Sequence, residues 1–254
     1  MRCGRCGTPN PEEALFCLAC GTRFAVAVAA PSRPAPSPLA HVGFRLIFVH
    51  PDGTDGTSHP LRADQIDIGR SEGDLLFEDV HLSPRHARII SDGRGQVLSA
   101  LESRNGVYVR LRGAAELQDG DMLLIGKQIL KFEIVSDFER NLQPAAQHDV
   151  VTFGTNCRPA WSRLRQIGPT GVSQDVFNFS RDQVVLGREQ CDVVFADDQF
   201  MSRQHARLSR TGTGAQIQDL GSSNGTFLRL AGDHLLAAGD LVRMGNVLLR
   251  YEPG

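Results

Sequence analysis

Two stretches of the chain repeat each other at a nearly constant distance, and this duplication is the strongest constraint on its fold. Gly69-Arg70 recurs 118 residues later as Gly187-Arg188. Other identities keep a distance of 119 residues: Ser83 and Ser202, His86 and His205, Arg88 and Arg207, Asn105 and Asn224, Gly120-Asp121 and Gly239-Asp240, and Gly126 and Gly245. A period this long is typical of a duplicated domain rather than a solenoid of short repeats.

The distance between matching residues grows by one inside the repeat. The pairs at the shorter distance of 118 also include Asp74 and Asp192, Phe77 and Phe195, and Asp79 and Asp197. We therefore expect the one-residue difference between the copies to lie between Asp79 and Ser83.

Short apolar runs separated by turn residues predict β-strands in both copies. Val184–Leu186 and Val193–Phe195 are two such runs in the second copy, and each is followed by a polar loop. No helical periodicity of useful length appears, so we predict an all-β fold with two tandem β-sandwiches. A chain of 254 residues leaves no room for an enzyme domain beside two domains of about 100 residues each.

The loops between these strands carry residues that together suit an anion. A guanidinium holds a phosphate through two parallel charge-assisted hydrogen bonds, and hydroxyls serve the remaining oxygens. The Gly-Arg, Ser-x-x-His and Ser-Asn-Gly motifs contain these groups and no carboxylate. Within these three motifs, therefore, no acidic side chain opposes a phosphate.

Gly187-Arg188, Ser202-x-x-His205 and Ser223-Asn224-Gly225, in this order, resemble the motifs of the forkhead-associated (FHA) domain. The resemblance implies a β-sandwich with a loop-end pocket that binds phosphothreonine in peptides. It implies an adaptor in Ser/Thr-kinase signalling whose partners are phosphothreonine-containing proteins, such as a kinase or its substrates.

The resemblance also assigns roles to single residues. It places these residues at the phosphopeptide: Arg188, Ser202, Arg203, Ser223 and Asn224 in the second copy, and Arg70, Ser83, Arg104 and Asn105 in the first. It gives these residues a structural role in the loops: His205, His86, Gly187, Gly69, Gly225 and Gly106. The histidine ring ties down the phosphate-binding loop, and the asparagine bonds the peptide backbone, although an Asn-Gly pair is also an ordinary hairpin turn.

The two copies differ at two of these positions. Pro84 stands where Arg203 stands, and Arg104 stands where Ser223 stands. Proline has no backbone N–H and no side-chain donor. We therefore expect the second site to bind phosphate more tightly than the first.

Ser202 and His205 also suggest a hydrolase dyad. A catalytic triad needs a base held by an acid and a prepared oxyanion site. The Ser-x-x-His loop offers neither, and the chain has no Gly-x-Ser-x-Gly elbow. We expect a protein that is not an enzyme.

The N-terminus carries two cysteine pairs, Cys3-x-x-Cys6 and Cys17-x-x-Cys20. Four thiolates in two such pairs suit tetrahedral zinc. The segment resembles the zinc ribbons at the head of many bacterial proteins, which implies a structural zinc ion and a bacterial source. Disulfides are the alternative, and the lack of an apolar signal segment argues against them.

The predicted organisation is a zinc ribbon (1–24), a Pro/Ala-rich linker (25–42), FHA domain 1 (43–136), a second linker (137–159) and FHA domain 2 (160–254). No apolar run is long enough to span a bilayer, so we expect a cytoplasmic protein without membrane contact. A net charge of -2 argues against a general nucleic-acid surface.

Three further expectations accompany this interpretation. One alternative is a scaffold whose FHA folds bind proteins without phosphate. Another is a nucleic-acid-binding or transcription regulator that acts through the zinc ribbon. Thr8 and Thr22 lie in the ribbon ahead of the linker, and tethering would give either one, once phosphorylated, a high local concentration at a site of the same chain.

Overall fold

The computed structural model describes residues 2, 6–9, 11, 19, 43–93, 95–155, 158–212 and 214–253. It forms two units, Met1–His41 and Val42–Gly254. In the first unit the described structure is a single bridge between Arg2 and Pro9. The linker at 25–42, Thr22 and the cysteines Cys3, Cys17 and Cys20 lie outside the described residues. No helix among the described residues is long and apolar enough to cross a bilayer.

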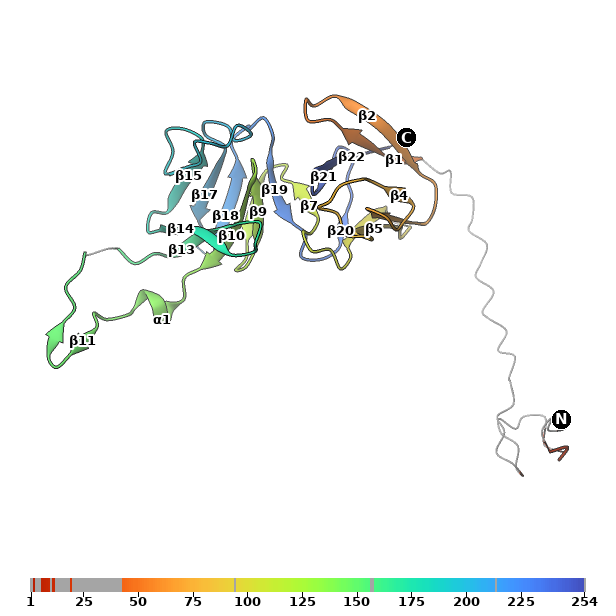
Figure 1. The fold of residues 1–254 in the computed structure, drawn as a ribbon, viewed down its shortest axis with the longest axis horizontal. Helices are drawn as coiled ribbons and strands as arrows, with labels where there is room; N and C mark the ends of the chain where they lie inside the picture. Colours follow the sequence, from red (N-terminus) through yellow and green to blue (C-terminus); the bar gives the residue numbers. More distant parts are fainter. Residues whose placement is uncertain are drawn as a thin grey trace. The chain divides into compact units, whose positions relative to one another are not determined.

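The second unit is almost entirely β-structure (Figure 1). The first repeat contributes β1 (Phe44–Val49), β2 (Asp55–Leu61), β3 (Gln65–Gly69), β4 (Leu75–Leu76), β5 (Ala87–Ser91), β6 (Gln96–Ala100), β7 (Tyr108–Arg110), β8 (Ala114–Leu117), β9 (Met122–Ile125) and β10 (Gln128–Ile134). The second repeat contributes β13 (Ser162–Ile167), β14 (Ser173–Phe179), β15 (Gln183–Gly187), β16 (Val193–Val194), β17 (Ala206–Arg210), β18 (Ala215–Asp219), β19 (Thr226–Arg229), β20 (His234–Leu235), β21 (Leu241–Met244) and β22 (Val247–Pro253).

The two repeats exchange their last strands. β10 of the first repeat pairs with β13 of the second, and β8 pairs with β18. In return, β22 at the end of the second repeat pairs with β1, and β20 pairs with β6. Each β-sandwich therefore combines the first part of one repeat with the last part of the other.

We call the sandwich built from residues 44–110 and 234–253 sandwich A, and the one built from residues 114–229 sandwich B. In sandwich A, the strands β7-β21-β22-β1-β2 lie opposite β20-β6-β5-β3-β4. In sandwich B, β14-β13-β10-β9-β19 lie opposite β16-β15-β17-β18-β8. One ten-stranded sheet runs through both sandwiches. Along the chain, sandwich B is inserted between β7 and β20 of sandwich A.

The sheet is continuous because β7 and β19 pair with each other between the sandwiches (Figure 1). Their register joins Phe227 to Arg110 and Arg229 to Tyr108. Tyr108, Phe227 and Leu124 form a small buried cluster there. This cluster belongs to both repeats and to both sandwiches.

Each main core draws side chains from both repeats. The core of sandwich B takes these residues from the first repeat: Leu117, Leu123, Ile125, Leu130 and Phe132. The core of sandwich A takes these from the second: Leu236, Val242, Met244, Val247, Leu249 and Tyr251. Burying five or six such side chains contributes on the order of 10 kcal/mol. Since a domain's net stability is about 5–15 kcal/mol, neither core is complete without the exchanged strands.

The expected all-β class with two FHA-type sandwiches is confirmed in the strand arrangement. The ranges 43–136 and 160–254 describe the sequence repeats, and they remain predictions as domain boundaries. The strand pairing divides the chain differently, because each sandwich uses residues from both ranges.

The segment expected as a linker at 137–159 joins two neighbouring strands of the same sandwich, β10 and β13. It contains the short helix α1 (Asp137–Arg140), capped by the Ser136 side chain, and a hairpin of β11 (Ala146–Gln147) and β12 (Val150–Val151). His148 and Asp149 turn the hairpin with φ of 51° and 62°, as a two-residue turn of the mirror-image type requires.

The strand exchange predicts which sandwich loses its structure when β22 is removed. A chain that ends at Asn246 lacks β22 and its buried side chains Val247, Leu249 and Tyr251. We expect the amides of β1, β3 and β5 to lose hydrogen-exchange protection because they belong to the same sandwich. The amides of β15, β17 and β18 should keep it. Protection lost instead in β13–β18, the strands of the same repeat, would contradict the exchange.

Candidate functional site

Three loops at one end of each sandwich bring the predicted binding residues together. We call these loop sets site A in sandwich A and site B in sandwich B. In site B, the Arg188 N–H donates to the Ser202 carbonyl over 2.9 Å, and in site A the Arg70 N–H donates to the Ser83 carbonyl over 3.0 Å. The predicted phosphate-contacting residues of each site all come from a single repeat.

The glycine before each arginine is required by a close approach of two loops. A Cβ atom at Gly187 would lie 2.0 Å from the Arg203 carbonyl oxygen, and one at Gly69 would lie 2.0 Å from the Pro84 carbonyl oxygen. No side chain fits at either place. The glycine thus permits the arginine loop to lie directly against the serine loop.

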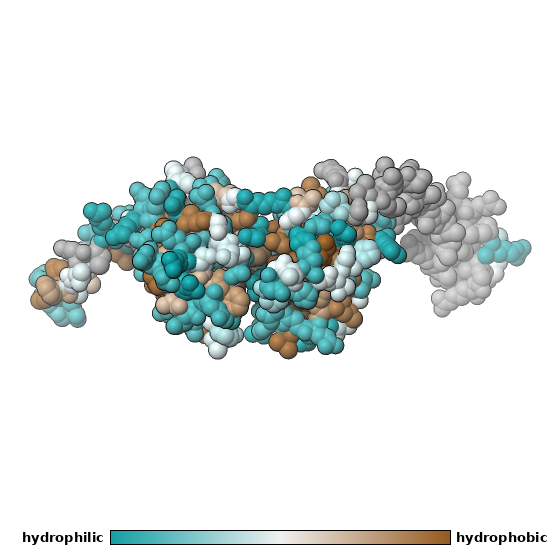
Figure 2. Space-filling model, turned by 90° about the horizontal axis from the view of Figure 1, so that it is seen from above, coloured by the Kyte–Doolittle hydropathy of each residue, from teal (hydrophilic) through white to brown (hydrophobic). Residues whose placement is uncertain are grey.

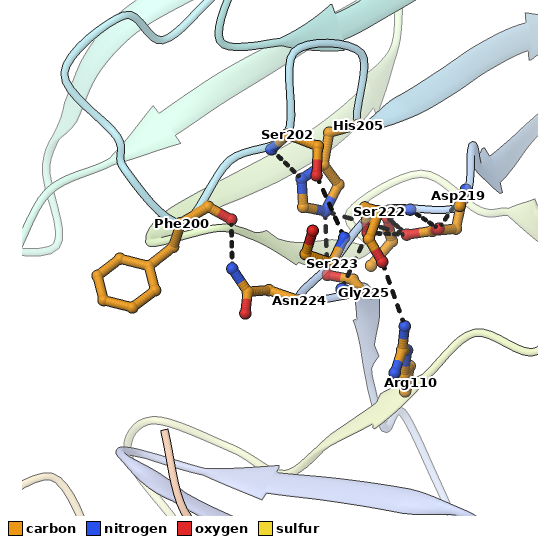
Figure 3. Close-up of polar contacts among 11 residues, drawn as sticks. Arg110, Phe200, Ser202, His205, Asp219, Ser222, Ser223, Asn224 and Gly225 are labelled. Carbon is orange, nitrogen blue, oxygen red and sulfur yellow. Dashed lines mark hydrogen bonds and ion pairs between the residues drawn. The ribbon is translucent and has the colours of Figure 1, made fainter. Parts of the chain in front are cut away.

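A buried histidine fastens two loops of each site. The Ser202 N–H donates to Nδ1 of His205 over 3.1 Å, and Nε2 of the ring lies 3.1 Å from the Gly225 carbonyl oxygen (Figure 3). Since Nδ1 accepts, the proton sits on Nε2 and the ring is neutral. Burial lowers the pKa of His205, which favours this neutral form.

His86 makes the same contacts in site A. The Ser83 N–H donates to its Nδ1 over 3.0 Å, and its Nε2 lies 3.0 Å from the Gly106 carbonyl oxygen. Burial lowers the pKa of His86 as well. The structure therefore places both histidines where the sequence predicts a structural role.

The serine and asparagine side chains of each site form further hydrogen bonds between its loops. In site B, the Ser202 hydroxyl accepts from the Ser223 N–H over 3.2 Å, and the Asn224 amide donates to the Phe200 carbonyl over 2.8 Å (Figure 3). In site A, the Ser83 hydroxyl accepts from the Arg104 N–H over 3.3 Å, and the Asn105 amide donates to the His81 carbonyl over 2.7 Å.

Each asparagine loop also touches an arginine from the other repeat. Gly225 has a φ of 81°, and a Cβ atom there would lie 2.3 Å from Nε of Arg110. Arg110 also donates to the Ser222 carbonyl over 3.5 Å (Figure 3). With the roles exchanged, a Cβ atom at Gly106 would lie 2.2 Å from Nε of Arg229. Both arginines come from the central strands β7 and β19, so these strands touch both sites.

A buried aspartate gives each site a second support from the other repeat. In site B, Asp198 accepts from the Lys127 N–H over 2.7 Å and from the Phe200 N–H over 2.9 Å. In site A, Asp79 accepts from the Asn246 N–H over 2.6 Å and from the His81 N–H over 2.9 Å. The Phe200 and His81 carbonyls accept from the two asparagines. Each carboxylate thus links the loop that contains this carbonyl to a turn between two exchanged strands.

These aspartates correct the predicted alignment of the repeats. Asp79 corresponds to Asp198, not to Asp197, so the one-residue difference lies before Asp79 and not after it. Two adjacent aspartates in the second repeat made the sequence ambiguous at this point. The supporting role of Asp79 and Asp198 was missed, because their partners Asn246 and Lys127 lie in the opposite repeat.

The loop of site B has a polar network that site A lacks. Asp219 accepts from the Gly221 and Ser222 N–H groups and from the Ser222 and Thr226 hydroxyls, over 2.6–2.9 Å (Figure 3). Although burial opposes it, these hydrogen bonds lower the pKa of Asp219. The first repeat has Ala100 and Val107 in place of Asp219 and Thr226, and its Ser103 hydroxyl is buried without a partner. The asparagine loop of site B therefore has hydrogen bonds that the loop of site A lacks.

A carboxylate that lies just outside the three motifs faces the arginines of site B. Glu189 lies 3.4 Å from Nε of Arg188 and 3.7 Å from Nε of Arg203. The first repeat has Ser71 at this position. The sequence shows this glutamate directly after the Gly-Arg motif, but a comparison restricted to the motifs passes over it.

The regions of the chain that contain the two sites match a known protein family. Residues 66–126 and 184–245 match the model of the FHA domain. The chain is 30% identical over 120 residues to the glycogen accumulation regulator GarA of Mycolicibacterium smegmatis, a match that covers 46% of this chain and 75% of GarA. The chain belongs to the FHA-domain family.

The chain is also similar to a second curated protein and to a solved structure. The chain is 28% identical over 123 residues to an oxoglutarate dehydrogenase inhibitor of Corynebacterium jeikeium, covering 47% of this chain and 84% of that protein. A solved structure from an analysis of phosphothreonine-dependent FHA domain interactions is 25% identical, with a TM-score of 0.21 over 33% of this chain and 86% of its own. Residues 2–24 match the model of a zinc-ribbon domain.

The cross-repeat support of site B can be tested at two adjacent aspartates. Asp198→Ala should destabilise sandwich B by about 1–3 kcal/mol, because it removes the buried carboxylate that accepts from the Lys127 and Phe200 N–H groups. Asp197→Ala is the matched control, since Asp197 is exposed, and should change the free energy of unfolding by less than about 0.5 kcal/mol. Denaturant unfolding of both variants gives the two values; equal losses would contradict the assignment of Asp198.

Proposed function

We propose that this FHA-domain chain is a phosphothreonine-peptide-binding adaptor in Ser/Thr-kinase signalling. The observation that carries the proposal is the convergence, in both sandwiches, of an arginine, a serine and an asparagine on loops held by a neutral histidine. The arginine supplies charge and a fork of donors for a phosphate, and the serine adds a hydroxyl. The asparagine amide lies beside them to read the peptide backbone.

The relatives support a regulatory role. One is named an inhibitor of oxoglutarate dehydrogenase and another a regulator of glycogen accumulation. A solved structure of Mycobacterium tuberculosis EmbR contains a low-affinity phosphopeptide. The partners we propose for this chain are phosphothreonine-containing proteins, such as a kinase or its substrates.

The geometry of the histidines also supports a binding protein rather than an enzyme. In His205, Nδ1 accepts from the Ser202 backbone N–H and Nε2 faces the Gly225 carbonyl. Both ring nitrogens are therefore engaged with the backbone. A general base needs a ring nitrogen within reach of the nucleophile's hydroxyl, and His205 has none left for Ser202.

We also propose that Cys3, Cys6, Cys17 and Cys20 hold one structural zinc ion. The support is the match of residues 2–24 to a zinc-ribbon domain and the donor set, because four thiolates in two Cys-x-x-Cys pairs suit tetrahedral zinc. Cys6 is exposed, and its Sγ lies 3.3 Å from the Thr8 hydroxyl. When bound, the ion would supply the folding energy that so short a segment lacks.

Phosphopeptide titrations of the full chain test the main proposal. Arg70→Ala and Arg188→Ala should each remove one site, with a loss of about 2–5 kcal/mol in binding free energy at that site. The double variant should bind no phosphopeptide. Phosphothreonine should bind at least about fourfold better than phosphoserine if its γ-methyl is buried, which is worth about 0.8 kcal/mol. Equal binding of phosphorylated and unphosphorylated peptides would instead favour a scaffold that does not depend on phosphate.

Elemental analysis tests the zinc proposal. The purified chain should carry one zinc ion, and Cys17→Ser should release it while the hydrogen-exchange protection of both sandwiches stays unchanged. A zinc content near zero after anaerobic purification would contradict the proposal.

A further inference from the structure

Site B contains an acidic side chain at the place where its two arginines meet. Glu189 lies against Arg188 on one side and Arg203 on the other, with N···O separations of 3.4 and 3.7 Å. The side chains of Arg188 and Glu189 are 34% and 49% exposed, so solvent and a ligand can reach both. One carboxylate thus offsets the positive charge of the two residues expected at a phosphate.

The backbone of Glu189 is fastened in place. Its N–H donates to the Arg203 carbonyl over 3.2 Å. Its carbonyl accepts from the thiol of Cys191 over 3.0 Å, and this thiol lies 2.9 Å from the Arg203 carbonyl as well. The next residue, Gln190, has a φ of 54°, a conformation that costs a non-glycine residue free energy. These contacts hold the glutamate beside the arginines.

Site A has no such side chain. Ser71 takes the position of Glu189, and its N–H donates to the Pro84 carbonyl over 3.3 Å. Among the described residues, Arg70 forms no ion pair, since the nearby carboxylates Asp67 and Glu72 face Arg85. The two sites therefore share their backbone geometry and differ in the charge that meets a ligand.

We propose that Glu189 is a built-in competitor for phosphate at site B, so that a ligand must displace it from Arg188 and Arg203. This rests on the proposed function, because it concerns the affinity of the same phosphopeptide site. A ligand with a single carboxylate would replace one carboxylate by another and gain little. A phosphate of charge about -1.5 to -2 with three acceptor oxygens gains more than it displaces. Glu189 thereby restricts site B to phosphorylated ligands and lowers its affinity for them.

The test isolates site B in the full chain by the substitution Arg70→Ala. In this background, Glu189→Gln keeps the size of the side chain and removes its charge. Two solvent-exposed ion pairs are together worth about two- to thirtyfold in affinity, so the best phosphothreonine peptide of site B should bind tighter by a factor in this range. The gain should shrink as salt rises from about 0.05 to 0.5 M, because exposed charges are screened.

A matched control is Asp197→Asn in the same background. Asp197 is exposed, belongs to a neighbouring loop of site B and contributes the same charge to the surface. It should leave the affinity within about twofold. If Glu189→Gln binds no tighter than its parent, if its gain does not depend on salt, or if Asp197→Asn gives the same gain, the proposal is overturned. If neither parent nor variant prefers phosphorylated to unphosphorylated peptide, the proposed function itself fails.

Discussion

The pairing of β7 with β19 is the contact on which the rest of the second unit depends. Each strand is the last element of its repeat to stay in the sandwich where the repeat began. Beyond β7 the chain crosses over Leu111–Gly113 into sandwich B, and beyond β19 it crosses back to sandwich A. The side chains of Tyr108 and Phe227 are buried where the chain crosses, at 5% and 2% exposure. Since both crossings pass this point, the β7–β19 pair joins the two sandwiches.

The exchange divides each binding site into two parts with different origins. The groups proposed to meet a ligand come from one repeat, whereas Lys127, Asn246, Arg110 and Arg229 support them from the other. The coloured part of the surface in Figure 2 is largely hydrophilic, with scattered apolar patches. The two sites differ in the hydrogen-bond network of Asp219 and in a small number of charges, above all that of Glu189, which site B has and site A lacks.

Much of this arrangement was predictable from the sequence because it is local. Alternating apolar residues and turn residues specify strands, and the Gly-Arg and Ser-x-x-His spacings place His205 next to Ser202. The strand exchange was not predictable, because β1 and β13 stand at the same place in the two repeats, and the motifs do not say which of them pairs with β10. A short link such as Leu111–Gly113 favours exchange. Asp198 was missed because its partner Lys127 lies in the other repeat, and Glu189 was missed because it lies outside the compared motifs.

The insertion of sandwich B within sandwich A reverses the order in which a growing chain can finish its parts. The strands β1–β7 leave the ribosome before sandwich B does, but their partners β20–β22 are made after it. Sandwich B, which is continuous from residue 114 to residue 229, is complete before them. At typical synthesis rates the first strands wait roughly 10–30 seconds for their partners. During that interval their apolar face is open to chaperones and to other nascent chains, so the part of the second unit that is made first is the last to be protected.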